Sequence, residues 1–270
     1  MGRLIAFLGL LAFAATAAEA ANHEVSAEAG TPARVASLGL CTDELVLLLA
    51  EPDQLVSVSF LGHDLRETPL APKARGLHSN DGRFSSVAHL KPDLVITGGA
   101  VNRFARELAE RTGTRVVDVP PPQTLAALRD NIRTVAAVLG HPARGAALIG
   151  WMDAKLKAAP ARANDALMVV AGGLTPDVHS IAAELLAHAG IRQMVMSSSR
   201  VSLEGLVATP PPLLILSRYR ADQFSLPQEW LGTATRLSGR KPAYVDGRFW
   251  SCPGPLAAAD VARLRAEITQ

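Results

Sequence analysis

The feature that most constrains the fold is a pattern that occurs twice in the chain. The first copy, FSSVAHLKPDLVIT, occupies residues 84–97, and the second, VSLEGLVATPPPLLILS, occupies residues 201–217. In each copy, apolar residues at helical spacing precede a proline, which ends a helix because it lacks an N–H and restricts the residue before it. Each copy then enters an apolar segment without alternation (94–97 and 213–216), typical of a strand covered on both faces of a parallel sheet. The repeat predicts two similar α/β lobes with a cleft between them, where a binding site is expected.

The first 20 residues have the pattern of a cleaved export signal. Arg3 precedes an apolar run at residues 4–15, and Ala18-Glu19-Ala20 puts small residues where a signal peptidase cleaves. The alternative, a membrane anchor, requires a longer apolar segment. No cysteine stands at the cleavage point to carry a lipid. We therefore predict a signal peptide at 1–20 and a soluble, exported mature chain.

Charge and motifs exclude other classes of function. A net charge of +2, with no basic stripe interleaved with aromatic residues, argues against nucleic-acid binding. The sequence has no G-x-S-x-G elbow, no phosphate-binding loop and no G-x-G-x-x-G turn, so we predict no enzymatic activity and no cofactor. Its two cysteines, Cys41 and Cys252, are too few for a disulfide scaffold, although they can pair in an oxidising compartment.

The remaining segments predict an order of elements that fits two lobes. In the first lobe, we expect strands at 34–38, 55–59 and 115–119, helices at 42–49 (capped by Thr42 or Asp43) and 103–112, and an irregular segment at 63–83. Residues 123–159 are alanine-rich and helical, with a break at 140–142. In the second lobe, we expect strands at 167–170 and 244–246 and helices at 180–189 and 261–268. The predicted domains are therefore 21–122, a helical spine at 123–160, and 161–270.

Four segments together resemble a known family: RVASLGLCTDELVLLLAEPDQLVSVS, LKPDLVITGG, VSLEGLVATPPPLLILS and FWSCPGPLAAADVARL. In order and spacing they are similar to the periplasmic binding proteins for ferric siderophores, haem and cobalamin, which feed ABC importers. The resemblance covers nearly the whole mature chain. It implies an α/β fold of two parallel-sheet lobes joined by a single long interdomain helix, with the ligand cleft between the lobes. It also implies a monomer that binds a metal chelate and meets an ABC permease and its ATPase.

The resemblance places the turns after the strands on the two walls of the cleft, which is also where open α/β sheets bind ligands. On the first wall it implies Cys41, Thr42, Phe60, His63, Asn80, Arg83, Gly98 and Gly99 as ligand-binding residues. On the second wall it implies Gly172, Arg218, Tyr219, Trp250 and Cys252. Since the two cysteines fall on opposite walls, they could form a disulfide, bind a soft metal such as copper, or be small cleft residues.

Basic side chains in or near these turns favour an anionic ligand. Guanidinium groups suit carboxylates and the anionic oxygens of iron chelates, and the candidates are Arg83, Arg103, Arg218, Arg220 and Arg248. Solvated surface charge is the alternative for each, and Arg218 beside Tyr219 is the strongest candidate. His63 and His78 could ligate a haem iron or be ordinary loop histidines. No histidine-rich motif is present, so a site for a bare metal ion is not expected.

The sequence departs from the family in two respects. Family members dock on the permease through a surface glutamate on each lobe. Glu204 matches the second-lobe position, but Ser85 occupies the first, so either Asp81 substitutes or docking is one-sided. Few aromatic residues fall at the predicted cleft, which argues against cobalamin. We expect a ferric siderophore first, cobalamin or another corrinoid second and haem third; the alternative is an exported chelate sensor or scavenger with no permease partner.

Overall fold

The computed structural model describes residues 30–99, 103–157, 164–220, 224–239 and 241–268. The predicted signal peptide at 1–20 and the side chain of Arg103 lie outside the described part of the chain. Within that part, no helix combines the length and the apolar character needed to cross a membrane.

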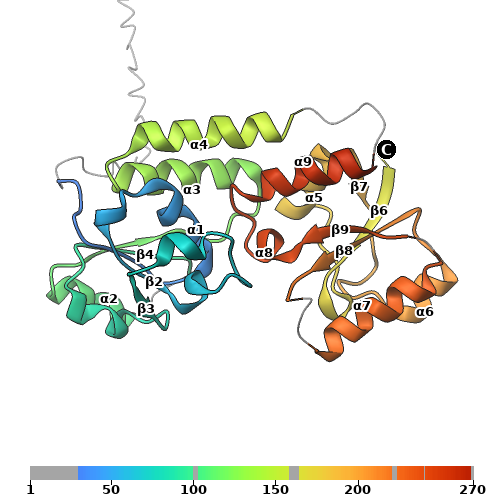
Figure 1. Cartoon of the computed structure of the whole chain (residues 1–270), viewed down its shortest axis with the longest axis horizontal. Helices are drawn as coiled ribbons and strands as arrows, with labels where there is room; N and C mark the ends of the chain where they lie inside the picture. Colours follow the sequence, from blue (N-terminus) through green and yellow to red (C-terminus); the bar gives the residue numbers. More distant parts are fainter. Residues whose placement is uncertain (1–29, 100–102, 158–163, 221–223, 240, 269–270) are drawn as a thin grey trace, which may run out of the picture. The chain divides into compact units, whose positions relative to one another are not determined.

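The first lobe is built on a parallel sheet with the strand order β3-β2-β1-β4-β5 (Figure 1). Its strands are β1 (Val35–Ser37), β2 (Leu55–Ser59), β3 (His78–Asn80), β4 (Leu94–Thr97) and β5 (Arg115–Asp118). Every residue of β1 and β4 is buried, as expected of central strands without polar alternation. Helices α1 (Leu40–Leu49) and α3 (Leu125–Val138) pack on one face, and α2 (Arg103–Arg111) covers the other.

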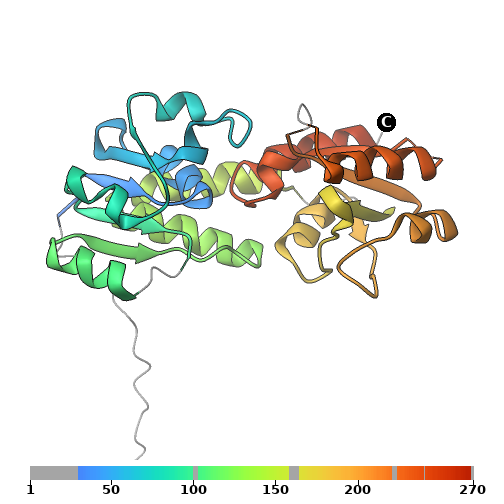
Figure 2. The same ribbon diagram turned by 90° about the horizontal axis from the view of Figure 1, so that it is seen from below.

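The second lobe repeats this plan with the strand order β7-β6-β8-β9, again all parallel. Its strands are β6 (Asn164–Val169), β7 (Ile191–Gln193), β8 (Leu213–Arg218) and β9 (Ala243–Asp246). Helices α5 (Ile181–His188) and α9 (Ala257–Ile268) cover one face, and α6 (Leu203–Ala208) and α7 (Leu226–Leu237) cover the other (Figures 1 and 2).

The repeated sequence pattern occupies equivalent places in the two sheets. Its strands are β4 and β8, which pair with β1 and β6 respectively. The helical parts differ. The second copy forms α6, in which the Ser202 hydroxyl accepts a hydrogen bond of 3.0 Å from the Gly205 N–H. The helical part of the first copy forms only two 3-10 turns, η4 (Phe84–Ser86) and η5 (Ala88–Leu90). It ends at Lys91, whose φ is 49°. The repeat is thus confirmed for the two strands, whereas the helical segments that precede them differ.

The connection between the lobes corrects one expectation. The resemblance implied a single long helix, but the segment forms two helices that pack on each other, α3 and α4 (Pro142–Lys155), with the break where the sequence pattern predicted it, at residues 140–142. The chain turns at Gly140, whose φ of 82° suits glycine, and Pro142 starts the next helix.

A second correction concerns α1 and the segments that the sequence pattern left irregular. Helix α1 begins at Leu40 with Gly39 as its N-cap, so neither Thr42 nor Asp43 caps it. The pattern also missed β3, β7, α7 and the short helix α8 (Gly247–Trp250).

Candidate ligand-binding site

A disulfide joins the two lobes. Cys41, in the first turn of α1, is bonded to Cys252, just after α8, with a Cα–Cα distance of 5.3 Å. Of the three interpretations open from the sequence, the structure therefore has the disulfide. Both sulfur atoms are used in this bond, so the soft-metal alternative is wrong, while contact of Cys41 and Cys252 with the ligand stays a prediction.

Beside this disulfide, a carboxylate of the first lobe is enclosed by the second. Glu44 accepts a hydrogen bond of 2.9 Å from the Leu256 backbone N–H. A Cβ added at Gly254 would lie 2.5 Å from Oε1 of Glu44, so a side chain at this position would displace the Glu44 carboxylate. Burial raises the pKa of Glu44 to about 7, which outweighs the opposing effect of the hydrogen bond. The junction thus contains a carboxyl group that titrates near neutrality.

Below the turns of the first lobe lies a buried polar network. The Asp43 carboxylate accepts hydrogen bonds from the hydroxyl and the backbone N–H of Ser59, and burial raises its pKa to about 6 against these hydrogen bonds. Thr42, 1% exposed, shares a 2.8 Å hydrogen bond with the Ser37 hydroxyl and donates to the Gly39 carbonyl.

Asn80 completes this network. Asn80 is also 1% exposed, and its side-chain NH2 donates hydrogen bonds of 2.8 Å to the Ser37 carbonyl and to the Ser57 hydroxyl. Its side-chain oxygen, Oδ1, accepts a hydrogen bond from the Gly82 N–H. The interpretation of Thr42 and Asn80 as ligand-facing is therefore wrong, because both are buried and use their polar atoms to hold backbone.

The other first-lobe candidates lie nearer the surface. Phe60 is 57% exposed, and Gly98 and Gly99 follow β4 at its carboxyl end. His63 is half-buried, and its Nε2 has no hydrogen-bond partner among the described residues. Arg83 is exposed and pairs with Asp81 at 2.9 Å.

The second lobe places arginines around a cavity at the ends of β8 and β9. The cavity has a volume of about 550 Å³. Its lining comes from the first lobe at Leu65 and Arg66 and from the second lobe at Arg218, Arg220, Tyr244, Val245, Asp246, Arg248 and Arg263. Arg218, Arg220 and Arg248 were predicted from the sequence. Arg66 and Arg263 were missed, because one lies in the irregular segment and the other on the terminal helix.

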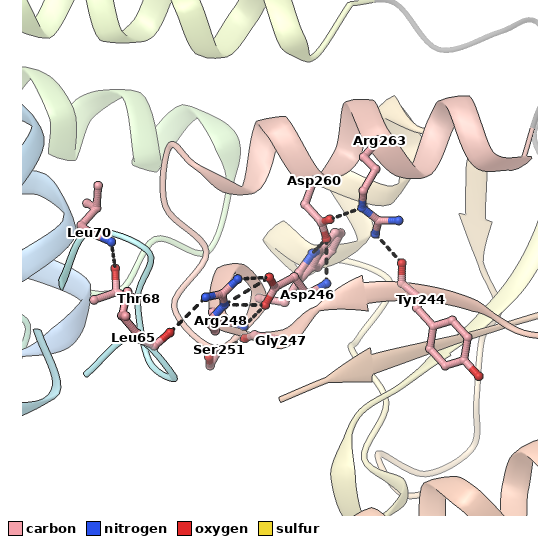
Figure 3. A network of polar contacts seen from close by, with 11 residues as sticks. Leu65, Thr68, Leu70, Tyr244, Asp246, Gly247, Arg248, Ser251, Asp260 and Arg263 are labelled. Atoms are coloured by element: carbon pink, nitrogen blue, oxygen red, sulfur yellow. Dashed lines mark hydrogen bonds and ion pairs between the residues drawn. The ribbon is translucent and has the colours of Figure 1, made fainter. Parts of the chain in front are cut away.

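Most of these arginines are held by carboxylates. Arg248 pairs with Asp246 at 2.6 Å and donates a 3.0 Å hydrogen bond to the Leu65 carbonyl of the first lobe (Figure 3). Burial works to raise the pKa of Asp246, but the hydrogen bonds from Arg248 outweigh it and keep that pKa below its ordinary value. Arg263 pairs with Asp260 at 2.8 Å and donates to the Tyr244 carbonyl (Figure 3). These pairs fix the cavity wall.

Arg218 differs from its neighbours. Its guanidinium carbon lies 3.4 Å from the centre of the Tyr244 ring, a cation–π arrangement, and the residue is exposed. Within the described ranges, no carboxylate pairs with it. It is thus a positioned cation on the cavity wall that can accept an anionic group.

Tyr219 and Arg220 turn toward the first lobe. The Tyr219 hydroxyl donates to the carboxylate of Glu67, and Arg220 forms an ion pair with the same carboxylate. Glu67 is 1% exposed. No sequence pattern marks Glu67, because it lies in the segment predicted to be irregular.

Two second-lobe candidates lie elsewhere. Trp250 is 7% exposed and donates its indole N–H to Asp260 at 2.8 Å, so its predicted contact with ligand is wrong. Gly172 takes a φ of 76°, and its carbonyl accepts from Arg200. It lines a separate hollow of about 630 Å³ that also includes Trp230 and Glu204. Gly172 therefore does not line the cavity that contains Arg218, Arg220 and Arg248.

Both predicted docking positions are on the surface. Glu204, in the first turn of α6, is exposed and has no ion pair among the residues that the structure describes. Ser85, in η4, is exposed as well, while Asp81 is already paired with Arg83.

Comparison with known proteins defines the class. A family model described as periplasmic binding protein matches residues 35–225, so the chain belongs to this family, which is a class of substrate-binding proteins and not of enzymes. No curated protein matches the sequence.

Among solved structures, the chain resembles the periplasmic haem-binding protein HutB of Vibrio cholerae, with 15% identity, a TM-score of 0.70, and coverage of 88% of this chain and 99% of that one. It also resembles the vitamin B12-binding protein BtuF of Vibrio cholerae (18% identity, TM-score 0.62, coverage 88% and 97%). A third is the siderophore-binding protein BauB, solved with acinetobactin and ferric iron (16% identity, TM-score 0.64, coverage 87% and 93%). These likenesses establish the two-lobe fold.

Proposed function

We propose that the protein is the periplasmic substrate-binding component of an ABC importer and that it captures a metal chelate between its lobes. The observation that carries this proposal is the arginine-lined cavity of about 550 Å³, to which both lobes contribute. Family membership supports the binding role. An export signal at residues 1–20 would deliver the chain to the periplasm.

The charge of the cavity favours an anionic chelate. Arginine forks form strong, directional hydrogen bonds with the oxygens of carboxylates and catecholates. A ferric siderophore with such groups is our first choice, and a corrinoid or haem follows. The three solved relatives bind ligands of these three kinds by their printed names, and the arginine wall is what orders the choice for this chain.

We assign the ligand contacts to groups that line this cavity and to turns that follow the strands of the first lobe. Arg218 would accept the anionic edge of the chelate, with Arg220, Arg248 and Tyr219 beside it. Phe60 offers an exposed apolar ring, and Gly98 and Gly99 leave room at the end of β4. His63 completes the proposed first wall, whereas Arg83 is already held by Asp81 and we assign it no direct contact with the chelate.

A binding panel tests the proposal. The disulfide-bonded mature protein would be titrated by calorimetry with an anionic ferric tris-catecholate, a neutral ferric tris-hydroxamate, cobalamin and haem. We expect saturable binding of the tris-catecholate at sub-micromolar concentration, and at least tenfold weaker binding of the neutral chelate. If none of the four compounds shows saturable binding, the proposal is contradicted.

Delivery to a permease rests on Glu204. We propose one-sided docking through this exposed carboxylate, because Ser85 has no charge and Asp81 is engaged by Arg83. In cells that express the importer, Glu204→Lys should reduce uptake of the iron-labelled chelate at least fivefold, whereas Ser85→Ala should leave it unchanged. Equal uptake with Glu204→Lys, or without the binding protein, would instead favour a sensor or scavenger.

A further inference from the structure

A buried carboxylate of the first lobe contacts an arginine that lines the cavity. Glu67 lies between η2 (Phe60–His63) and η3 (Ala71–Ala74), and its backbone N–H donates to the Asp64 carbonyl at 2.9 Å. The residue is only 1% exposed. A buried carboxylate is strongly disfavoured unless charged or hydrogen-bonding partners compensate it. The partners of Glu67 therefore determine whether it can be held in this position.

Two side chains of the second lobe contact the Glu67 carboxylate. Tyr219 donates its hydroxyl to this carboxylate, and Arg220 forms an ion pair with it. Both residues directly follow β8, next to Arg218. A single first-lobe carboxylate thus connects to the segment that carries the proposed recognition arginine.

The backbone at this contact is unusual. Arg220 has a φ of 50°, a left-handed conformation that is unfavourable for a residue with a side chain. Surrounding contacts must hold such a residue in place, and the ion pair with Glu67 is one that does so. The Arg220 side chain is 33% exposed while Glu67 is buried, so Arg220 presents one side to the cavity and the other to Glu67.

We propose that Glu67 is a specificity-determining residue of the cleft, which competes with the anionic groups of the ligand for Arg220 and Tyr219. This inference rests on the proposed chelate-binding function. A weakly basic or neutral ligand cannot replace the buried carboxylate at these groups. A chelate with several negatively charged oxygens can share or take over Arg220, and doing so would loosen the connection between Glu67 and the second lobe. Glu67 would therefore set how much negative charge a ligand needs.

The test compares Glu67→Gln with Glu110→Gln. The first change keeps the size of the side chain but removes its charge and replaces one of its two acceptor oxygens with an NH2 donor. The second removes a charge from an exposed position on α2 of the same lobe. Calorimetry would measure affinity for the trianionic ferric tris-catecholate and for a neutral ferric tris-hydroxamate. Amide hydrogen exchange without any chelate would be followed in peptides that cover residues 64–68 and 217–220.

We expect Glu67→Gln to bind the trianion about tenfold more tightly, because Arg220 loses its competing charge. The neutral chelate should change less than twofold, and Glu110→Gln should match the wild type. Exchange at 217–220 should accelerate in Glu67→Gln alone. If Glu67→Gln does not fold, Tyr219→Phe provides a second variant, because it removes the hydrogen bond from the Tyr219 hydroxyl to Glu67. We expect this variant also to accelerate exchange in the peptide that covers residues 217–220.

Two results would overturn the proposal, and they are distinguishable. If the wild type binds the trianion and Glu67→Gln binds it equally or more weakly, the competition is refuted while the chelate-binding function stands. If no variant binds either chelate, the proposed function fails and the competition with it, even where exchange at 217–220 accelerates.

Discussion

The carboxyl-terminal edges of the two sheets share one architecture but present opposite surfaces. In the first lobe, a group of polar side chains at this edge is buried and hydrogen-bonded to neighbouring serine hydroxyls and backbone, as with Thr42, Asp43 and Asn80. In the second lobe, Arg218 and Arg248 lie on a cavity wall, partly or fully accessible. The first edge is a rigid scaffold, and the second carries the charge.

The contrast shows how one repeated unit can acquire two roles. Short serine, threonine and asparagine side chains reach the backbone of adjacent turns, and their polar atoms are used in hydrogen bonds that hold these turns. Long arginine side chains extend beyond the strand ends and keep a charged group accessible while their stems pack. Residues of the same predicted location therefore differ in function because of side-chain length.

The largest effect should come from breaking the covalent link between the two edges. The double variant Cys41→Ser/Cys252→Ser opens a loop with a sequence separation of 211 residues. We expect the free energy of unfolding to fall by about 3–5 kcal/mol, because the unfolded chain regains entropy. Denaturant unfolding of both proteins measures this. A loss below about 1 kcal/mol would mean that the lobes are held together without the disulfide.

The next effect concerns Glu44, where the second lobe encloses a first-lobe carboxylate. Its pKa is about 7 in the folded protein against an ordinary 4.5. The folded state thus holds this proton more tightly than the unfolded chain, and stability falls as pH rises from about 4.5 to about 7. Glu44→Gln should therefore match the wild type near pH 4.5 and exceed it by about 3 kcal/mol at pH 8.

Thermal or denaturant unfolding at both pH values tests the Glu44 prediction. Asp43, whose pKa is also raised, is present in both proteins, so the difference isolates Glu44. A constant stability difference across this pH range would show that Glu44 is not the titrating group.

A smaller loss of unfolding free energy should follow from removing a side chain of the buried polar network in the first lobe. Asn80→Ala removes donors to the Ser37 carbonyl and the Ser57 hydroxyl and leaves the Gly82 N–H without its acceptor. We expect a loss of about 2 kcal/mol in unfolding free energy, and chelate affinity within twofold of the wild type. Affinity that falls while stability is unchanged would place Asn80 on the ligand instead.

The smallest effect separates the two edges by affinity. Arg218→Ala should weaken binding of the ferric tris-catecholate about tenfold, because the cavity wall loses a cation that no carboxylate of the described residues holds. Arg83→Ala removes an arginine of the first lobe that is already paired with Asp81 and is exposed, and should change affinity less than twofold. Comparable losses in both variants, measured by calorimetry, would remove the distinction between the edges.

The sequence pattern predicted the fold well where burial controls it. Apolar runs located β4 and β8, and the repeat correctly indicated two parallel-sheet lobes. The pattern failed at β3 and β7, which are three-residue strands at the ends of their sheets, too short to show a period. It did predict the break at residues 140–142, where Gly140 and Pro142 mark a turn, whereas the family resemblance implied one continuous helix.

The site was less predictable because neighbourhood in sequence does not give side-chain direction. Trp250 follows β9 as a cleft residue should, yet its ring is buried and its N–H is bonded to Asp260. Arg263 and Glu67 enter the site from a helix and an irregular segment, where no periodicity marks them. Arg218 was predictable, because it ends a buried strand and its side chain must leave the core.

Hydrogen exchange of the wild type, with and without saturating ferric tris-catecholate, tests the central claim most directly. We predict protection at residues 64–67, 218–220 and 246–248, which surround the arginine-lined cavity. The opposite ends of the second-lobe strands, at 164–166 and 241–243, should exchange as before. Protection confined to those opposite ends, or none at all, would contradict a chelate site between the two edges.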